Sequence, residues 1–207
     1  MAVLLEKKRN KKIESLLDRG FKLDILDIIR GRRSIRKYKT DSVPKDLIEK
    51  ILEAGRWAPS AGNVQPWEFI VINDRKILDL VRKFSPGFFG DAPLAILICS
   101  NKERARKFRG SLGRDLAIID CAMAAQNILL TAYALGLGSC PIKSFSQIAI
   151  REILEIPDHL EPELLIAIGY PDQKPPPPPK RPLSEMVHLN KYGVKWKNMS
   201  EQIEGEK

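Results

Sequence analysis

The chain has 207 residues, of which 43% are hydrophobic and 29% charged, enough to fold as one domain with its own core. No apolar run approaches the roughly 20 residues that cross a bilayer, and the first residues lack the apolar stretch of a secretion signal. The net charge of +9 indicates an anionic ligand or nucleic acid as partner. Because the three cysteines are widely spaced and the two histidines lie far apart, we expect reduced thiols in a cytoplasmic protein and no metal site.

The N-terminal part of the chain is predicted to be helical. A basic helix over about residues 3–19 forms an extension that spans residues 1–21. A second helix covers residues 23–30, with apolar residues spaced to pack one face against a core, and Gly31 terminates it. Pro44 marks the first turn of a helix that reaches Ala54.

Strands and helices are mixed in the rest of the chain. The pattern predicts strands at 67–72, 94–99 and 164–168, and helices at about 75–83, 112–135 and 147–154. The helix at 112–135 is apolar on most sides, which predicts a central, buried position. Residues 175–179 are five prolines and predict an extended connector.

Two basic runs, at residues 7–12 and 102–109, have two possible explanations. They could form a nucleic-acid footprint, or they could be solvated faces of a basic protein. Aromatic residues do not interleave with them, except for Phe108, and this favours the solvated faces.

A denser cationic cluster follows the second helix, where Arg32, Arg33, Ser34 and Arg36 fall within five residues. Guanidinium groups and a hydroxyl together suit a phosphate, because they offer several directed donors. A solvated basic turn is the alternative.

Several familiar chemistries are missing from the sequence. It has no GxGxxG after a strand, no P-loop and no GxSxG elbow. Cys140 has no histidine partner in the sequence, so we interpret it as a small residue at a tight backbone passage and not as a nucleophile. A phosphate-like site without a catalytic constellation is typical of a protein whose chemistry comes from a cofactor.

The segment Trp57–Phe69 strengthens that idea. It contains Pro59, Gly62 and several polar side chains between a predicted helix and a predicted strand. A plain connecting loop would not require so many residues with special backbone or hydrogen-bonding properties.

These segments together resemble the FMN-dependent nitroreductase family. The resemblance covers about residues 22–190 and rests on motifs that occur in the family's order. They are 32–36, 58–67, 120–127, 136–142, and 168–171 with 180–183.

The resemblance implies an α+β fold, a mixed sheet flanked by helices, and an intertwined homodimer with two FMN molecules at the subunit interface. It divides the chain into a basic extension at 1–21, an FMN-binding domain at 22–190 and a C-terminal tail at 191–207.

The resemblance also implies which residues hold the cofactor. Arg32, Ser34 and Arg36 would bind the phosphate and the polar edge of the flavin, with Arg33 acting mainly through its backbone. Arg181, with Lys180, would close on the same phosphate. Pro59, Ser60, Ala61 and Asn63 would reach the flavin from the other subunit. Pro141, Ile142 and Lys143 would lie beside the reactive ring, where the Lys143 side chain either favours negative charge or points to solvent.

The function implied is reduction of nitroaromatic, quinone or similar acceptors by NADH or NADPH, in a ping-pong order and without a catalytic side chain. Two other flavin branches of the fold, which make dimethylbenzimidazole or remove halogen, stay open, although Asn63 favours the nitroreductase branch. A basic nucleic-acid-binding module is the alternative from a different class.

Overall fold

The computed structural model describes residues 24–196, except for the side chain of Arg109. These residues form two compact units, one ending at Pro175 and the other beginning at Pro176. The helix predicted at residues 3–19 lies outside the described residues, and the predicted domain limits at 22 and 190 stay a prediction.

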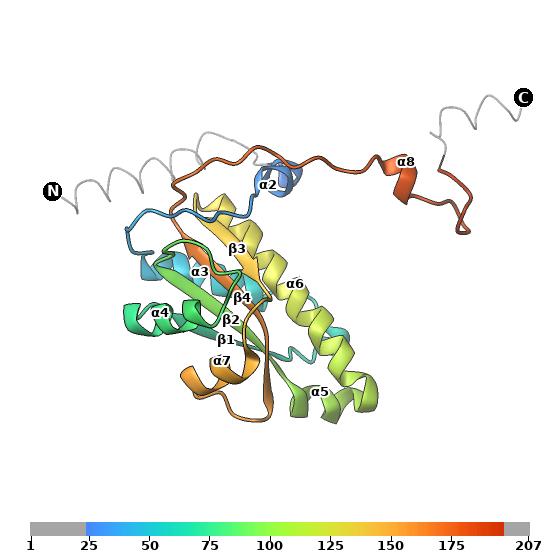
Figure 1. Cartoon of the computed structure of the whole chain (residues 1–207). Helices are drawn as coiled ribbons and strands as arrows, with labels where there is room; N and C mark the ends of the chain where they lie inside the picture. Colours follow the sequence, from blue (N-terminus) through green and yellow to red (C-terminus); the bar gives the residue numbers. More distant parts are fainter. Residues whose placement is uncertain (1–23, 197–207) are drawn as a thin grey trace, which may run out of the picture. The chain divides into compact units, whose positions relative to one another are not determined.

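The first unit is an α+β structure, which confirms the predicted fold class (Figure 1). Its strands are β1 (Trp67–Ile72), β2 (Leu94–Asn101), β3 (Gly138–Ile142) and β4 (Leu160–Gly169). Its α-helices are α2 (Ile25–Gly31), α3 (Lys45–Arg56), α4 (Arg75–Lys83), α5 (Lys102–Arg109), α6 (Gly113–Ala134) and α7 (Gln147–Ile153). Two short 3₁₀ turns, η1 (Ala61–Asn63) and η2 (Gly110–Leu112), complete the set.

The four strands form one antiparallel sheet in the order β1-β2-β4-β3. Phe69 pairs with Ile98, Ile96 with Ile166, and Cys140 with Ala167. Strand β2 lies inside the sheet and is buried along almost its whole length, as its continuous apolar sequence requires. The two edges of the sheet are β1 and β3. Strand β3 can hold Pro141 because an edge strand tolerates a residue without an N–H donor.

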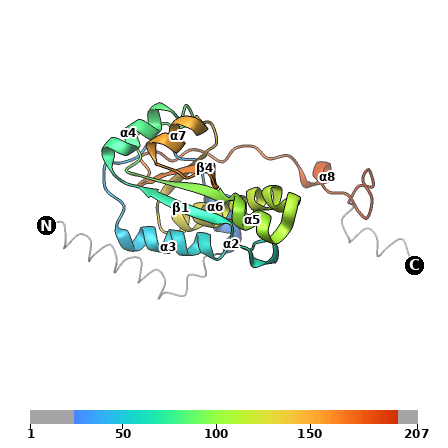
Figure 2. The same cartoon turned by 90° about the horizontal axis from the view of Figure 1, so that it is seen from below.

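Helices cover both faces of the sheet (Figures 1 and 2). Alternate strand residues point to opposite faces, so Ile96 and Ile166 pack with α3 and α6, while Leu97 and Leu165 pack with α4 and α7. The sheet therefore lies between two apolar layers, and its β3 edge is free to receive another segment.

Most predicted elements are confirmed, and β1 and α4 have the predicted bounds. Asp74 sets the start of α4, because its carboxylate accepts from the backbone N–H groups of Lys76 and Ile77 at 2.9 and 3.0 Å. Among the strands and α-helices of the first unit, β3 and α5 were missed. Strand β3 contains a glycine and a proline, and α5 was interpreted only as a basic run.

The predicted burial of α6 is half right. One side packs on the sheet and α3 and includes Ala124 and Ile128, but Ile118, Ile119 and Met123 on the other side are exposed. The stretch Gly110–Ala134 is long and apolar enough to span a membrane by composition alone, and 44% of its most apolar window is buried inside the fold. It packs as a core helix with one open apolar side.

The predicted packing of α2 against a core is wrong. The helix forms, yet none of its residues is buried, and Ile25, Leu26 and Ile29 are exposed. The reason is that α3 and α6 already cover this face of the sheet, so α2 meets only the C-terminal end of α6 (Figure 1).

The second unit is described by itself. It contains α8 (Leu183–Met186) and a short bridge between His188 and Lys195. The proline run before α8 has no helix or strand, as predicted.

Candidate functional site

The cationic segment 32–36 lies along the open edge of β3. Ser34 forms a parallel bridge with Ser139, and the backbone N–H of Ile35 donates to the Ser139 carbonyl at 3.0 Å. Gly138 permits this approach, because a Cβ there would lie 2.7 Å from Cγ1 of Ile35. The backbone of β3 thus fixes the position of the arginines.

Three side chains of this segment affect the pKa of one residue of β3, Cys140. Burial raises the pKa of the Cys140 thiol, while the charges of Arg36 and Arg32 and a hydrogen bond with Ser34 oppose that rise. The Cys140 thiol therefore lies within the range of the positive charges of Arg32 and Arg36 and beside the Ser34 hydroxyl.

Arg32 carries a signal for an anionic ligand. Its Nη1 atom is buried and has no hydrogen-bond partner among the described residues, and the same holds for Oγ of Ser139. A buried guanidinium nitrogen without an acceptor is costly, so an anion that supplies the acceptor would stabilise this arrangement. The residues present therefore fit a phosphate group.

The side chain of Arg33 forms hydrogen bonds to backbone carbonyls at the end of α2. Its Nη1 donates to the carbonyls of Arg30 and Arg32 at 2.5 and 2.7 Å. The side chain closes the C-terminal end of α2, where helix carbonyls lack partners.

The loop that carries Pro59, Ser60, Ala61 and Asn63 is held in an unusual conformation. Gly62 and Asn63 have φ of 63° and 56°, and Gln65 has φ of 52°. Oγ of Ser60 accepts from the N–H of Gln65 at 3.0 Å, so the hydroxyl stabilises the turn from within. Pro59 and Asn63 remain exposed, as a loop that contacts a ligand requires.

Asp120 of α6 holds this loop in place, a role that the sequence analysis missed. The carboxylate is 4% exposed, and both of its oxygens lie 3.2 Å from the backbone nitrogen of Ala61. The signal was available, because a carboxylate inside an otherwise apolar helix needs a hydrogen-bond donor.

The two parts of the predicted site contact α6 at different heights, one at its C-terminal end and the other near its middle. Gly31, next to Arg32, contacts Tyr133, where a Cβ on the glycine would overlap the tyrosine ring and hydroxyl. Ala61 contacts Asp120. At a rise of about 1.5 Å per residue these two positions on α6 are about 20 Å apart.

Pro141, Ile142 and Lys143 lie at the end of β3. The Ile142 side chain is buried in the core, whereas Pro141 is exposed beside the arginine segment. Nζ of Lys143 lies 3.4 Å from the Glu163 carboxylate and 3.5 Å from the Pro162 carbonyl. The side chain thus turns toward β4, and this defines an orientation that the sequence left open.

Lys180 and Arg181 belong to the second unit. Both are exposed, and Nε of Arg181 pairs with Glu185 at 3.2 Å. Their predicted contact with the phosphate stays a prediction.

Two residues of the basic run at 102–109 make contacts within the fold. Lys102 pairs with Glu161 at 3.1 Å, and Nε of Arg104 donates to the Val64 carbonyl at 2.8 Å. The Glu161 carboxylate offsets the charge of Lys102, and the bond to Val64 holds the Arg104 side chain against the fold, so both are less available to a polyanion. This weakens the nucleic-acid hypothesis.

Comparison with known protein families identifies one match. A model described as the Nitroreductase family matches residues 29–86 and 81–170, which include the arginine segment, the 59–63 loop and β3.

Known proteins and solved structures resemble the chain along most of its length. A Methanothermobacter thermautotrophicus protein, provisionally named NADH dehydrogenase/NAD(P)H nitroreductase, is 39% identical over 161 residues, covering 74% of this chain and 81% of that protein. The crystal structure of a Clostridium difficile nitroreductase family protein shares 32% identity with a TM-score of 0.72, covering 82% of this chain and 99% of that chain. An FMN-dependent nitroreductase from Clostridium difficile R20291 shares 34% identity with a TM-score of 0.71, covering 81% of this chain and 99% of that chain.

Proposed function

Because the chain belongs to the Nitroreductase family, we propose that it is an FMN-dependent oxidoreductase that takes electrons from NADH or NADPH and reduces nitroaromatic, quinone or similar acceptors. The single observation that carries the proposal is the buried Nη1 of Arg32, which lacks a partner among the described residues and lies in a segment fixed against β3. The family match and the FMN-dependent relative of 34% identity support the assignment of the cofactor.

We assign the phosphate of FMN to Arg32 and Ser34. Both belong to the segment that lies beside β3, and directed donors of this kind suit phosphate oxygens. Arg36 is exposed and would contact the pyrimidine edge, where its charge would favour the reduced, anionic flavin. Arg33 would contribute through its backbone, because its side chain is bonded to α2. Lys180 and Arg181 would add charge to the same phosphate.

The active unit is proposed to be a homodimer. Within one chain, the Ala61–Asp120 hydrogen bond holds the 59–63 loop about 20 Å along α6 from the residue that contacts Gly31. Pro59, Ser60, Ala61 and Asn63 would therefore complete the site of a second copy. The exposed apolar side chains of α2 and α6 give that copy a surface to cover.

Bound FMN would supply the acceptance and donation of hydride. The end of β3 would contribute backbone groups of Pro141, Ile142 and Lys143 beside the ring, and the ion pair with Glu163 turns the Lys143 side chain toward β4. The nicotinamide and the acceptor would use the same open face in turn, which is ping-pong order. The three free cysteines are buried, and this supports a cytoplasmic location.

A visible spectrum of the purified protein, followed by steady-state kinetics, tests the proposal. We expect flavin absorption bands, oxidation of NADH or NADPH in the presence of a quinone, and parallel double-reciprocal plots. A colourless protein that takes up no added FMN, yet binds DNA with a steep salt dependence, would overturn the proposal.

A further inference from the structure

The loop between α4 and β2 lies against both segments that are assigned to the flavin. A Cβ on Gly90 would overlap the carbonyl oxygen of Arg36 and lie 3.2 Å from its carbonyl carbon. A Cβ on Gly87 would overlap Oγ of Ser144 and lie 3.2 Å from Cγ2 of Ile142. The backbone of this loop, residues 85–91, therefore contacts the arginine segment at one end and the end of β3 at the other.

The start of this loop is fixed by hydrogen bonds just before it and within it. The N–H of Ser146 donates at 2.8 Å to the carbonyl of Phe84, which directly precedes the loop, and the N–H of Phe88 donates to the Ser85 carbonyl at 2.8 Å. The Phe88 side chain is buried in the core. The loop thus has a defined conformation between the two flavin segments.

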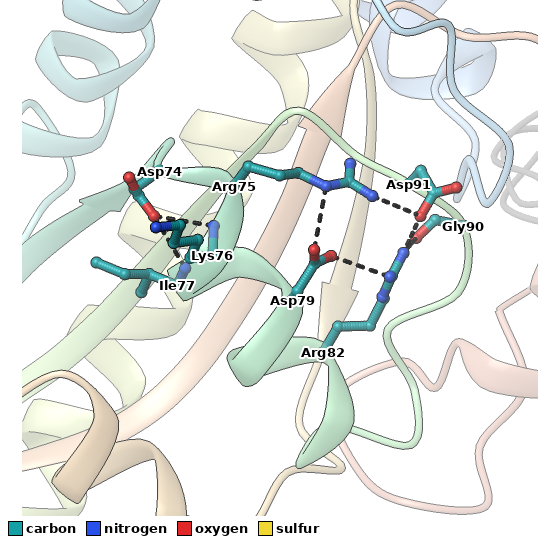
Figure 3. Close-up of polar contacts among 8 residues, drawn as sticks. All are labelled: Asp74, Arg75, Lys76, Ile77, Asp79, Arg82, Gly90 and Asp91. Atoms are coloured by element: carbon teal, nitrogen blue, oxygen red, sulfur yellow. Dashed lines mark hydrogen bonds and ion pairs between the residues drawn. The ribbon is translucent and has the colours of Figure 1, made fainter.

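An ion-pair network fixes the far end of the loop to α4 (Figure 3). Asp91 contacts Arg82 and also Arg75, the latter at 3.4 Å, and Asp79 pairs with Arg82 at 3.0 Å. Each exposed pair contributes little by itself, but the shared carboxylate restrains the backbone beside Gly90. The backbone that carries the neighbouring side chains of the loop therefore has a restrained position.

Phe89 is an exposed aromatic side chain on this restrained loop. It is 56% exposed, whereas the preceding Phe88 is 6% exposed. An exposed aromatic ring on a restrained backbone can stack on a flat aromatic molecule at a small entropic cost.

We propose that Phe89 is a specificity-determining residue that contacts flat aromatic acceptors at the flavin site. The inference rests on the proposed function, because the contacts of Gly87 and Gly90 place the loop next to segments whose role is to hold FMN. Phe89 then favours planar, apolar acceptors over small inorganic ones.

The test compares Phe89→Ala and Phe89→Trp with the wild type, using menadione as a planar acceptor and ferricyanide as an inorganic one. Leu80→Ala, which removes an exposed apolar side chain of α4, serves as the control. We expect Phe89→Ala to keep its FMN content and its ferricyanide turnover, and to lose about tenfold in kcat/KM for menadione. Phe89→Trp should restore most of that loss.

The outcomes separate the two proposals. An equal effect on both acceptors, no effect on menadione, or loss of FMN from Phe89→Ala would overturn the role of Phe89 alone. A wild-type protein that binds no FMN would overturn the proposed function and this inference with it.

Discussion

At the scale of single residues, the arginines of the segment 32–36 differ in what surrounds them. Arg32 and Arg33 each have a buried nitrogen without a partner among the described residues, Nη1 and Nε respectively. Arg33 also donates through Nη1 to the Arg30 carbonyl of α2, and Arg36 is exposed. Since all three share charge and residue type, the differences come from the backbone path that bridges to Ser139. Arg33 therefore caps α2, and Arg32 is the arginine that we propose for ligand binding.

Replacing Arg32 with alanine should weaken FMN binding. A charge-assisted hydrogen bond contributes about 1.5–3 kcal/mol, so we expect the Kd of FMN to rise about tenfold to a hundredfold. Titration of the apoprotein with FMN, followed by flavin fluorescence, measures this. Arg30→Ala is the matched control, because it removes an exposed arginine of α2 with the same charge change. Equal affinity in Arg32→Ala and the control would refute the phosphate assignment.

The buried thiol of Cys99 should make stability depend on alkaline pH. Burial raises its pKa from 9.0 to about 12. Because the unfolded chain loses this proton first, the stabilising effect is complete below pH 9 and is lost as the pH rises toward 12. Urea denaturation between these limits should show a free energy of unfolding that falls by up to about 1.4 kcal/mol per pH unit for this group. Cys99→Ala should have a shallower fall. Identical slopes for the two proteins would contradict the prediction.

At the scale of elements, α6 sets the spacing of the site. It holds the 59–63 loop through Asp120, near the middle of the helix, and meets Gly31 of α2 through Tyr133 at its C-terminal end. A helix has a fixed rise, so the distance between these contacts does not depend on the loops. The element thus acts as a rigid spacer between two parts of the site.

Replacing Asp120 with alanine should release the loop. The N–H of Ala61 would lose its acceptor, which costs about 1–3 kcal/mol when the group stays buried. We expect a lower urea midpoint and faster proteolytic cleavage within residues 59–65. Asp115→Ala, at an exposed position of the same helix, should change neither by a comparable amount. A loop that stays resistant in Asp120→Ala would show that other contacts hold it.

At the scale of the whole molecule, the first unit carries more apolar surface than its own sheet can cover. The sheet is filled on both faces, and the exposed residues of α2 and α6 lie outside these two layers. Exposed apolar side chains on adjacent helices are typical of a surface for another chain. A homodimer would cover them and bring each 59–63 loop to the other copy's arginines.

Replacing Met123 with glutamate should prevent that association. We expect the wild type to have twice the 23.4 kDa of one chain, and Met123→Glu to sediment as a monomer with little FMN. Ile148→Glu is the control, because it places the same charge on an exposed apolar position of α7. A wild-type monomer that binds FMN fully would contradict the dimer proposal.

The sequence by itself determined the local elements and the candidate residues. The sequence pattern predicted the bounds that β1 and α4 have, and the order of the motifs indicated the family. Helices, strands and short motifs depend on residues a few positions apart, so the sequence pattern is enough to predict them. The roles of the predicted site residues stay predictions.

Only the tertiary structure decided how distant residues meet. It showed that Pro141 lies in an edge strand, that Asp120 holds Ala61, and that Lys143 turns to Glu163. It also left α2 uncovered, although its periodicity fits a packed face. Periodicity reveals which side of a helix is apolar, but the surface that covers that side depends on contacts between segments far apart in the chain, or in another chain.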